Sequence, residues 1–82
     1  MDQSVIDIIY NEYHQLEHQE VKQTLETLGL EHVMANSEAN LNNAIHAILK
    51  LAKGNMTEIR RLTECAKIDF RDVIYWASLE NK

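Results

Sequence analysis

The chain of 82 residues contains no proline, two glycines and one cysteine. One cysteine excludes a disulfide within the chain, and a lone thiol suits the reducing cytoplasm. No apolar run approaches the roughly 20 residues of a membrane-spanning helix. The first residues also lack the basic and apolar regions of a targeting signal. We therefore expect a cytoplasmic protein that does not enter a membrane.

Helix-forming residues fill the chain, and no stretch alternates apolar with polar residues. This pattern predicts an all-α protein. The length suits one domain, residues 1–82. We predict a compact orthogonal or irregular bundle of four to five helices. A chain of this size buries roughly 60% of its unfolded surface, so a metal or a second subunit could add stability.

The formal charge of −5 is distributed unevenly along the chain. Residues 1–49 carry eight acidic residues and one basic residue, which gives −7, whereas residues 50–82 carry seven basic and five acidic residues, which gives +2. An acidic chain disfavours general binding to nucleic acid or anionic lipid. The asymmetry favours contact between the two halves, within one chain or between copies, if the charges are not simply solvated.

The first half begins with two apolar stripes that do not lie on one helix face. We expect the first helix to begin at Ser4, with Asp7 three residues later. The step from Leu16 to Val21 rotates the apolar face, which indicates two helices or one bent helix, with the change near residues 14–19. The first stripe contains Ile6, Ile9, Tyr13 and Leu16, and the second contains Val21, Leu25 and Leu28.

The middle of the chain reads as a connection followed by a helix. Residues 31–37 lack a clear period, and we expect Val33 and Met34 to pin them to the core. Ser37 or Asn40 can cap the next helix. Gly29 and Gly54 each fit the left-handed position just after a helix end. The core stripe of the helix contains Leu41, Ala44, Ile45, Ile48 and Ala52, with Leu51 beside it.

The last third carries two helix starts. Asn55 precedes Glu58 by three residues, and Asp69 precedes Asp72 by three, so each pair can form a reciprocal cap. The segment from Phe70 to Leu79 is apolar nearly all round, which predicts a deeply buried helix covered by more than one neighbour. Its inner face contains Phe70, Val73, Ile74 and Ala77, widened by Trp76 and Leu79.

Residues 14–18 spell H-x-x-E-H, a string similar to that of the inverted zinc metallopeptidases. That resemblance implies zinc held by His14 and His18, with Glu17 as general base. The chain is too short for a substrate cleft, so we do not expect peptidase activity. On a continuous helix, however, the two histidines would share a face, and a plain metal site using His14 and His18 is one hypothesis. The other is that both are solvated or hydrogen-bonded.

Two further groups have a structural and a functional interpretation. Arg60, Arg61 and Lys67 form a small basic patch, which would serve a helix-turn-helix transcriptional regulator. Adjacent arginines point about 100° apart on a helix, so this patch is unfocused. Cys65 lies beside Leu62 and Ala66 and is expected to be a buried structural thiol.

The last helix has two interpretations. It is either a central helix of the core that leaves Arg71, Tyr75 and Ser78 on the outside, or Trp76 or Tyr75 reaches a partner surface, where aromatic residues are common. If Trp76 is core, truncation to alanine should cost about 3–5 kcal/mol. We expect a non-enzymatic interaction or adaptor module, without a cofactor, that binds a protein partner or a second copy of itself. The alternatives are the His14/His18 metal protein and the transcriptional regulator.

Overall fold

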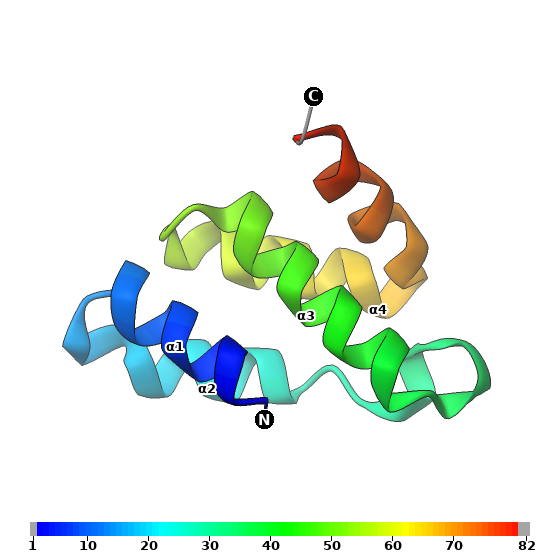
Figure 1. The fold of residues 1–82 in the computed structure, drawn as a ribbon, viewed down its shortest axis with the longest axis horizontal. Coiled ribbons are helices and arrows are strands. Elements are labelled where there is room, and N and C mark those ends of the chain that lie inside the picture. Colours follow the sequence, from blue (N-terminus) through cyan, green and yellow to red (C-terminus); the bar gives the residue numbers. More distant parts are fainter. Residues whose placement is uncertain (1, 81–82) are drawn as a thin grey trace.

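The computed structural model describes residues 2–80 and confirms an all-α fold (Figure 1). No β-strand occurs among these residues. The helices are α1 (Gln3–Glu12), α2 (His18–Glu26), α3 (Glu38–Ala52) and α4 (Met56–Leu79), with 3₁₀ turns η1 (Gln15–Glu17), η2 (Leu30–His32) and η3 (Met34–Asn36).

Helix α3 lies at the centre of the bundle. It shares its most extensive interface with α4, while α1 and α2 lie together at one end (Figure 1). The second half of α4 turns back, so that Ile74 and Ala77 lie near Asn43 and Ala47 of α3. The radius of gyration is 11.6 Å, close to the roughly 12 Å expected of a compact chain of this length.

A break at Asp69 divides α4. Asp69 has non-helical backbone angles (φ −156°, ψ 102°), and its Oδ1 accepts a hydrogen bond from the Arg71 backbone N–H at 3.0 Å. The predicted helix start is therefore confirmed, although the bond reaches Arg71 and not Asp72. The expectation that this helix is deeply buried is wrong for part of its surface. Phe70, Val73 and Ala77 are buried, whereas Trp76 and Leu79, which were expected to widen the inner face, are exposed. Tyr75 is exposed, as expected.

The segment that was predicted to form two helices or one bent helix forms two separate helices, α1 and α2. Tyr13 and His14 both have extended backbone, which separates α1 from the corner formed by η1. Helix α1 begins at Gln3 and not at Ser4. Its buried stripe is Val5, Ile9 and Tyr13, and Leu16 is 86% exposed because it lies in the corner. The second stripe, Val21, Leu25 and Leu28, is buried as expected.

Capping hydrogen bonds explain where α3 and α4 begin. The Asn55 side chain accepts a hydrogen bond from the Glu58 N–H, and the Ser37 hydroxyl accepts one from the Asn40 N–H, each at 3.3 Å. Gly54 has φ +82°, as its role after α3 predicts. Gly29 is extended at φ −112°, so its predicted left-handed conformation is wrong.

The core is one cluster of mainly aliphatic side chains drawn from all four α-helices, with Tyr13 and Phe70 as its aromatic members. Its most deeply buried large members are Ile9, Leu25, Ile48, Leu49, Ile59 and Leu62. Val33 joins the cluster, but Met34 is exposed, so only the first of the two residues expected to pin the connection does so. Leu41, Leu51, Cys65 and Ile74 pack against the cluster and are partly buried.

Candidate interaction surfaces

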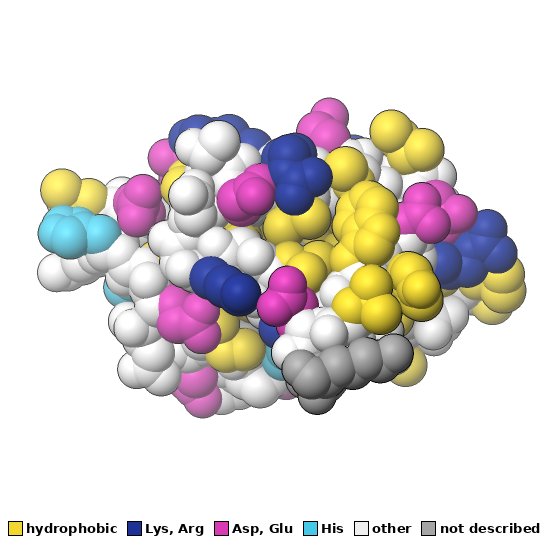
Figure 2. Space-filling model, turned by 90° about the horizontal axis from the view of Figure 1, so that it is seen from above, with side chains coloured by type: hydrophobic (Ala, Val, Ile, Leu, Met, Phe, Trp, Pro, Cys, Tyr) yellow, Lys and Arg dark blue, Asp and Glu magenta, His cyan; other side chains and the backbone are white. Residues whose placement is uncertain are grey.

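The second half of α4 presents an exposed apolar surface, here called the C-terminal apolar face and composed of Tyr75, Trp76 and Leu79. Their exposed fractions are 62%, 37% and 42%. At 3.6 residues per turn, Leu79 lies between Tyr75 and Trp76 around the helix axis, so the three cover one continuous arc. Figure 2 looks down on this side of the molecule and shows hydrophobic side chains gathered among charged ones.

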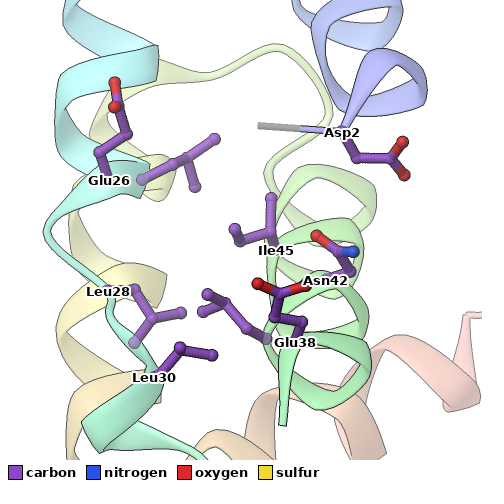
Figure 3. Close-up of a pocket in the computed structure, with 9 residues that line it drawn as sticks. Asp2, Glu26, Leu28, Leu30, Glu38, Asn42 and Ile45 are labelled. Carbon is purple, nitrogen blue, oxygen red and sulfur yellow. The ribbon is translucent and has the colours of Figure 1, made fainter. Parts of the chain in front are cut away.

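A second surface is a groove between the end of α2 and the start of α3, here called the acidic groove (Figure 3). Its volume is about 490 Å³. Leu28 and Leu30 point from one wall toward Ile45 on the other. The lining residues are Asp2, Leu25, Glu26, Leu28, Leu30, Glu38, Leu41, Asn42 and Ile45. The sequence alone did not predict this groove, although the excess of acidic residues in 1–49 indicated a negatively charged surface in this half.

The three carboxylates of the acidic groove differ in their surroundings. Asp2 accepts a hydrogen bond from the Ser4 hydroxyl at 2.7 Å, and its Oδ2 lies 3.7 Å from His46 Nε2. The Ser4 hydroxyl lowers the pKa of Asp2. Within residues 2–80, Glu26 and Glu38 form no hydrogen bond or ion pair through their carboxylates. Two acidic groups therefore remain available to a ligand.

His14 and His18 do not lie one turn apart on a continuous helix, because the helix is interrupted between α1 and α2. His14 Nδ1 accepts a hydrogen bond from the Leu16 N–H at 3.2 Å. His18 Nε2 donates to the Tyr13 carbonyl at 2.8 Å, and its ring lies 4.7 Å from that of Tyr10. Across the described residues 2–80, no three His, Cys, Asp or Glu side chains are grouped to hold a metal ion. A metal site on this pair stays a prediction.

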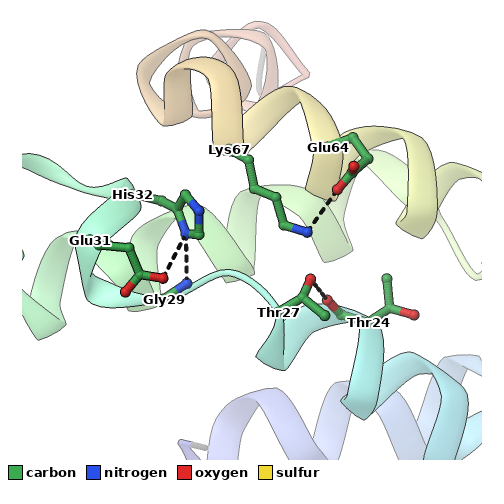
Figure 4. Close-up of polar contacts among 7 residues, drawn as sticks. All are labelled: Thr24, Thr27, Gly29, Glu31, His32, Glu64 and Lys67. Atoms are coloured by element: carbon green, nitrogen blue, oxygen red, sulfur yellow. Dashed lines mark hydrogen bonds and ion pairs between the residues drawn. The ribbon is translucent and has the colours of Figure 1, made fainter.

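His32 also makes local contacts. Its Nδ1 accepts a hydrogen bond from the Gly29 N–H at 2.9 Å and lies 3.4 Å from a Glu31 carboxylate oxygen (Figure 4). The Thr27 hydroxyl donates to the Thr24 carbonyl at 2.7 Å. These bonds close the connection between α2 and η2, and so fix the Leu28 and Leu30 wall of the acidic groove.

The three basic residues of the predicted nucleic-acid patch each pair with a carboxylate. Arg60 bonds to Glu20 of α2, Arg61 Nε lies 2.6 Å from Glu58, and Lys67 Nζ lies 2.8 Å from Glu64. Figure 4 shows Lys67 and Glu64 above the α2–η2 connection. Their charge is therefore largely compensated within the chain, which weakens attraction to phosphate.

Among residues 2–80, the hydroxyls of Tyr13 and Thr63 are buried without a hydrogen bond of ordinary geometry. Burial raises the pKa of Tyr13 to about 12, an effect that the nearby Gly54 backbone opposes. Tyr13 packs in the core where α1 ends. Cys65 is only partly buried, although it packs against the core as expected.

No protein-family model, curated protein or solved structure matches this chain. Within residues 2–80, no helix combines the length and the hydrophobicity needed to cross a membrane. The C-terminal apolar face and the acidic groove are therefore the features of this chain that bear on its function.

Proposed function

We propose that this protein is a non-enzymatic interaction module that self-associates through the C-terminal apolar face. The observation that carries this proposal is the exposure of Tyr75, Trp76 and Leu79 on one arc of a helix whose opposite arc is buried. Exposed aromatic residues grouped in this way are typical of interface centres. The lone thiol of Cys65 suits a cytoplasmic setting.

The uniqueness of Trp76 makes it a direct probe, because its emission reports only on this face. Self-association should shift the emission to shorter wavelength as protein concentration rises, since the indole leaves water. Sedimentation velocity on the same samples should show a rise in mass over the same range. A mass of one chain and unchanged emission at the highest workable concentration would reject the proposal.

A double variant tests the surface while keeping the probe. Tyr75→Ser with Leu79→Ser should abolish both the rise in mass and the emission shift. The matched control is Leu16→Ser with Met34→Ser, which also removes two exposed apolar side chains but lies elsewhere. Equal loss of association in both double variants would indicate non-specific adhesion instead of a defined interface.

The two alternatives from the sequence have their own tests. Metal analysis of protein purified without a histidine tag, with melting in chelator, tests the His14/His18 site. Retardation of DNA duplexes at low salt tests Arg60, Arg61 and Lys67, because phosphate contacts are strongest there. Stoichiometric metal or salt-sensitive DNA binding would favour the corresponding alternative.

A further inference from the structure

The apolar residues that line the acidic groove are all aliphatic and come from separate parts of the chain. Leu25 and Leu28 belong to the region of α2, Leu30 to η2, and Leu41 and Ile45 to α3. Figure 3 shows side chains from the two walls directed toward one another across an open space. A volume of about 490 Å³ lies within the range of ligand-binding sites in proteins.

Among residues 2–80, the charged residues that line the acidic groove are all acidic. They are Asp2, Glu26 and Glu38, and no lysine, arginine or histidine of this part of the chain lines it. Glu26 is the last residue of α2, where a carboxylate meets the negative end of the helix dipole and destabilises the helix. The end of α2 therefore does not stabilise the negative charge of Glu26.

The charge of the rim selects the ligand class. Anionic lipid and nucleic acid would be repelled by three carboxylates. An aliphatic floor bordered by carboxylates complements a segment with apolar residues on one face and Lys or Arg beside them, the form in which helices bind grooves. We propose that the acidic groove binds a cationic amphipathic helix of a partner protein. This proposal is independent of self-association through the C-terminal apolar face.

A synthetic helix provides the probe. It is a peptide of about 18 residues, long enough to form a helix, with leucine on one face and lysine on the other. Two comparison peptides keep this length: one has glutamate in place of lysine, and the other has the same composition in scrambled order. Amide chemical shifts of the full chain locate the bound peptide, and titration gives the Kd.

Shifts should concentrate at Leu28, Leu30 and Asn42, and the glutamate and scrambled peptides should bind much more weakly. Glu26→Gln with Glu38→Gln should raise the Kd about tenfold, because two charge contacts are lost. Neither carboxylate has a partner within residues 2–80, so this double variant should keep the fold, which circular dichroism checks.

The matched control is Glu12→Gln with Glu17→Gln, which makes the same change of charge in the α1–α2 corner. It should leave the Kd within about twofold, the residual effect of long-range charge. Equal weakening by both double variants would overturn the proposal, as would equal binding of the scrambled peptide or no binding. Shifts centred on Tyr75 and Trp76, or groove shifts that appear with protein concentration alone, would assign the contact to another surface or to a second copy and would equally overturn it.

Discussion

The hydroxyl of Tyr13 is a buried polar group that makes no hydrogen bond of ordinary geometry within residues 2–80, although the Gly54 backbone lies close enough to oppose its pKa shift. Tyr13→Phe keeps the ring in the core and removes the cost of that burial. We expect the free energy of unfolding at neutral pH to stay the same or to rise by up to about 1 kcal/mol. Urea unfolding measures it, with Tyr10→Phe as a control because Tyr10 is exposed. A clear loss of stability would show that the hydroxyl has a partner.

The same hydroxyl predicts a response to alkaline pH. Its pKa is about 12 in the folded protein, against 10.0 for an unperturbed tyrosine. Between these values the unfolded chain ionises while the folded chain does not, so stability is lost as pH rises from 10 through 12. Tyr13→Phe should reduce this loss. In near-ultraviolet titration, the ionisation step near pH 12 should disappear in this variant.

Phe70 and Trp76 both lie in the second half of α4, but Phe70 is buried and Trp76 is exposed. Phe70 is 9% exposed, and its truncation to alanine should cost about 3–5 kcal/mol. Trp76 is 37% exposed, so we expect Trp76→Ala to cost only about 1–2 kcal/mol in dilute solution. Comparison of the two variants by urea unfolding tests this order. The reverse order would restore the interpretation of Trp76 as a core residue.

At the scale of elements, Gly54 and Gly29 give a matched pair. Gly54 has φ +82°, and an added Cβ would lie 3.0 Å from the Glu12 backbone oxygen. Gly54→Ala should therefore lower the free energy of unfolding by at least about 1 kcal/mol. Gly29 has an extended backbone, and the three atoms nearest to an added Cβ belong to the carboxylate end of the Glu31 side chain, which can rotate away. Gly29→Ala should cost much less, and similar melting temperatures for both variants would contradict this account.

Helix ends could be read from the sequence because capping is local. Ser37, Asn55 and Asp69 each bond to a backbone N–H two or three residues later, so each signal lies within a few residues. The side of a helix that faces water depends on distant elements. Leu16 and Met34 were expected in the core, yet both lie in short connecting turns that the core does not cover.

The candidate surfaces could be predicted only in part for the same reason. The helical pattern placed Tyr75 on the outside, where it lies, but it placed Trp76 on the inner face, because the exposure of Trp76 depends on which side of α4 meets α3. The acidic groove joins Asp2, Glu26 and Glu38 from three helical regions, which no local pattern brings together. The excess of acidic residues in 1–49 indicated the negative charge of the groove but not its position in the fold.

At the scale of the whole molecule, ion pairs join parts of the chain that are distant in sequence. The bond between Arg60 and Glu20 joins α4 to α2, and Lys53, just after α3, lies 3.3 Å from Glu80, just after α4. These groups are exposed, so each pair should contribute less than about 1 kcal/mol. Their sum should weaken with salt, because screening acts on exposed charges.

Three carboxyl groups predict how the molecule responds to acid. The Ser4 hydroxyl lowers the pKa of Asp2, the Arg61 guanidinium lowers that of Glu58, and the Arg71 guanidinium lowers that of Asp69. A lowered pKa means that the folded chain gives up these protons more readily than the unfolded chain does. Their contribution to stability is therefore complete above the unperturbed values of 3.8 and 4.5 and is lost as pH falls below them.

On account of these groups, we expect the urea midpoint to change little between about pH 7 and pH 5 and to fall from about pH 4 toward pH 3. Because the three carboxyl groups are exposed to solvent, the fall should be modest. Arg71→Gln isolates one part of this response, because it removes the cation that keeps Asp69 ionised. The variant should be less stable than the parent at neutral pH, and the difference should shrink in acid, where Asp69 is protonated in both. A difference that stays constant down to pH 3 would mean that Arg71 stabilises the break in α4 by packing, and that the charge of Asp69 does not matter there.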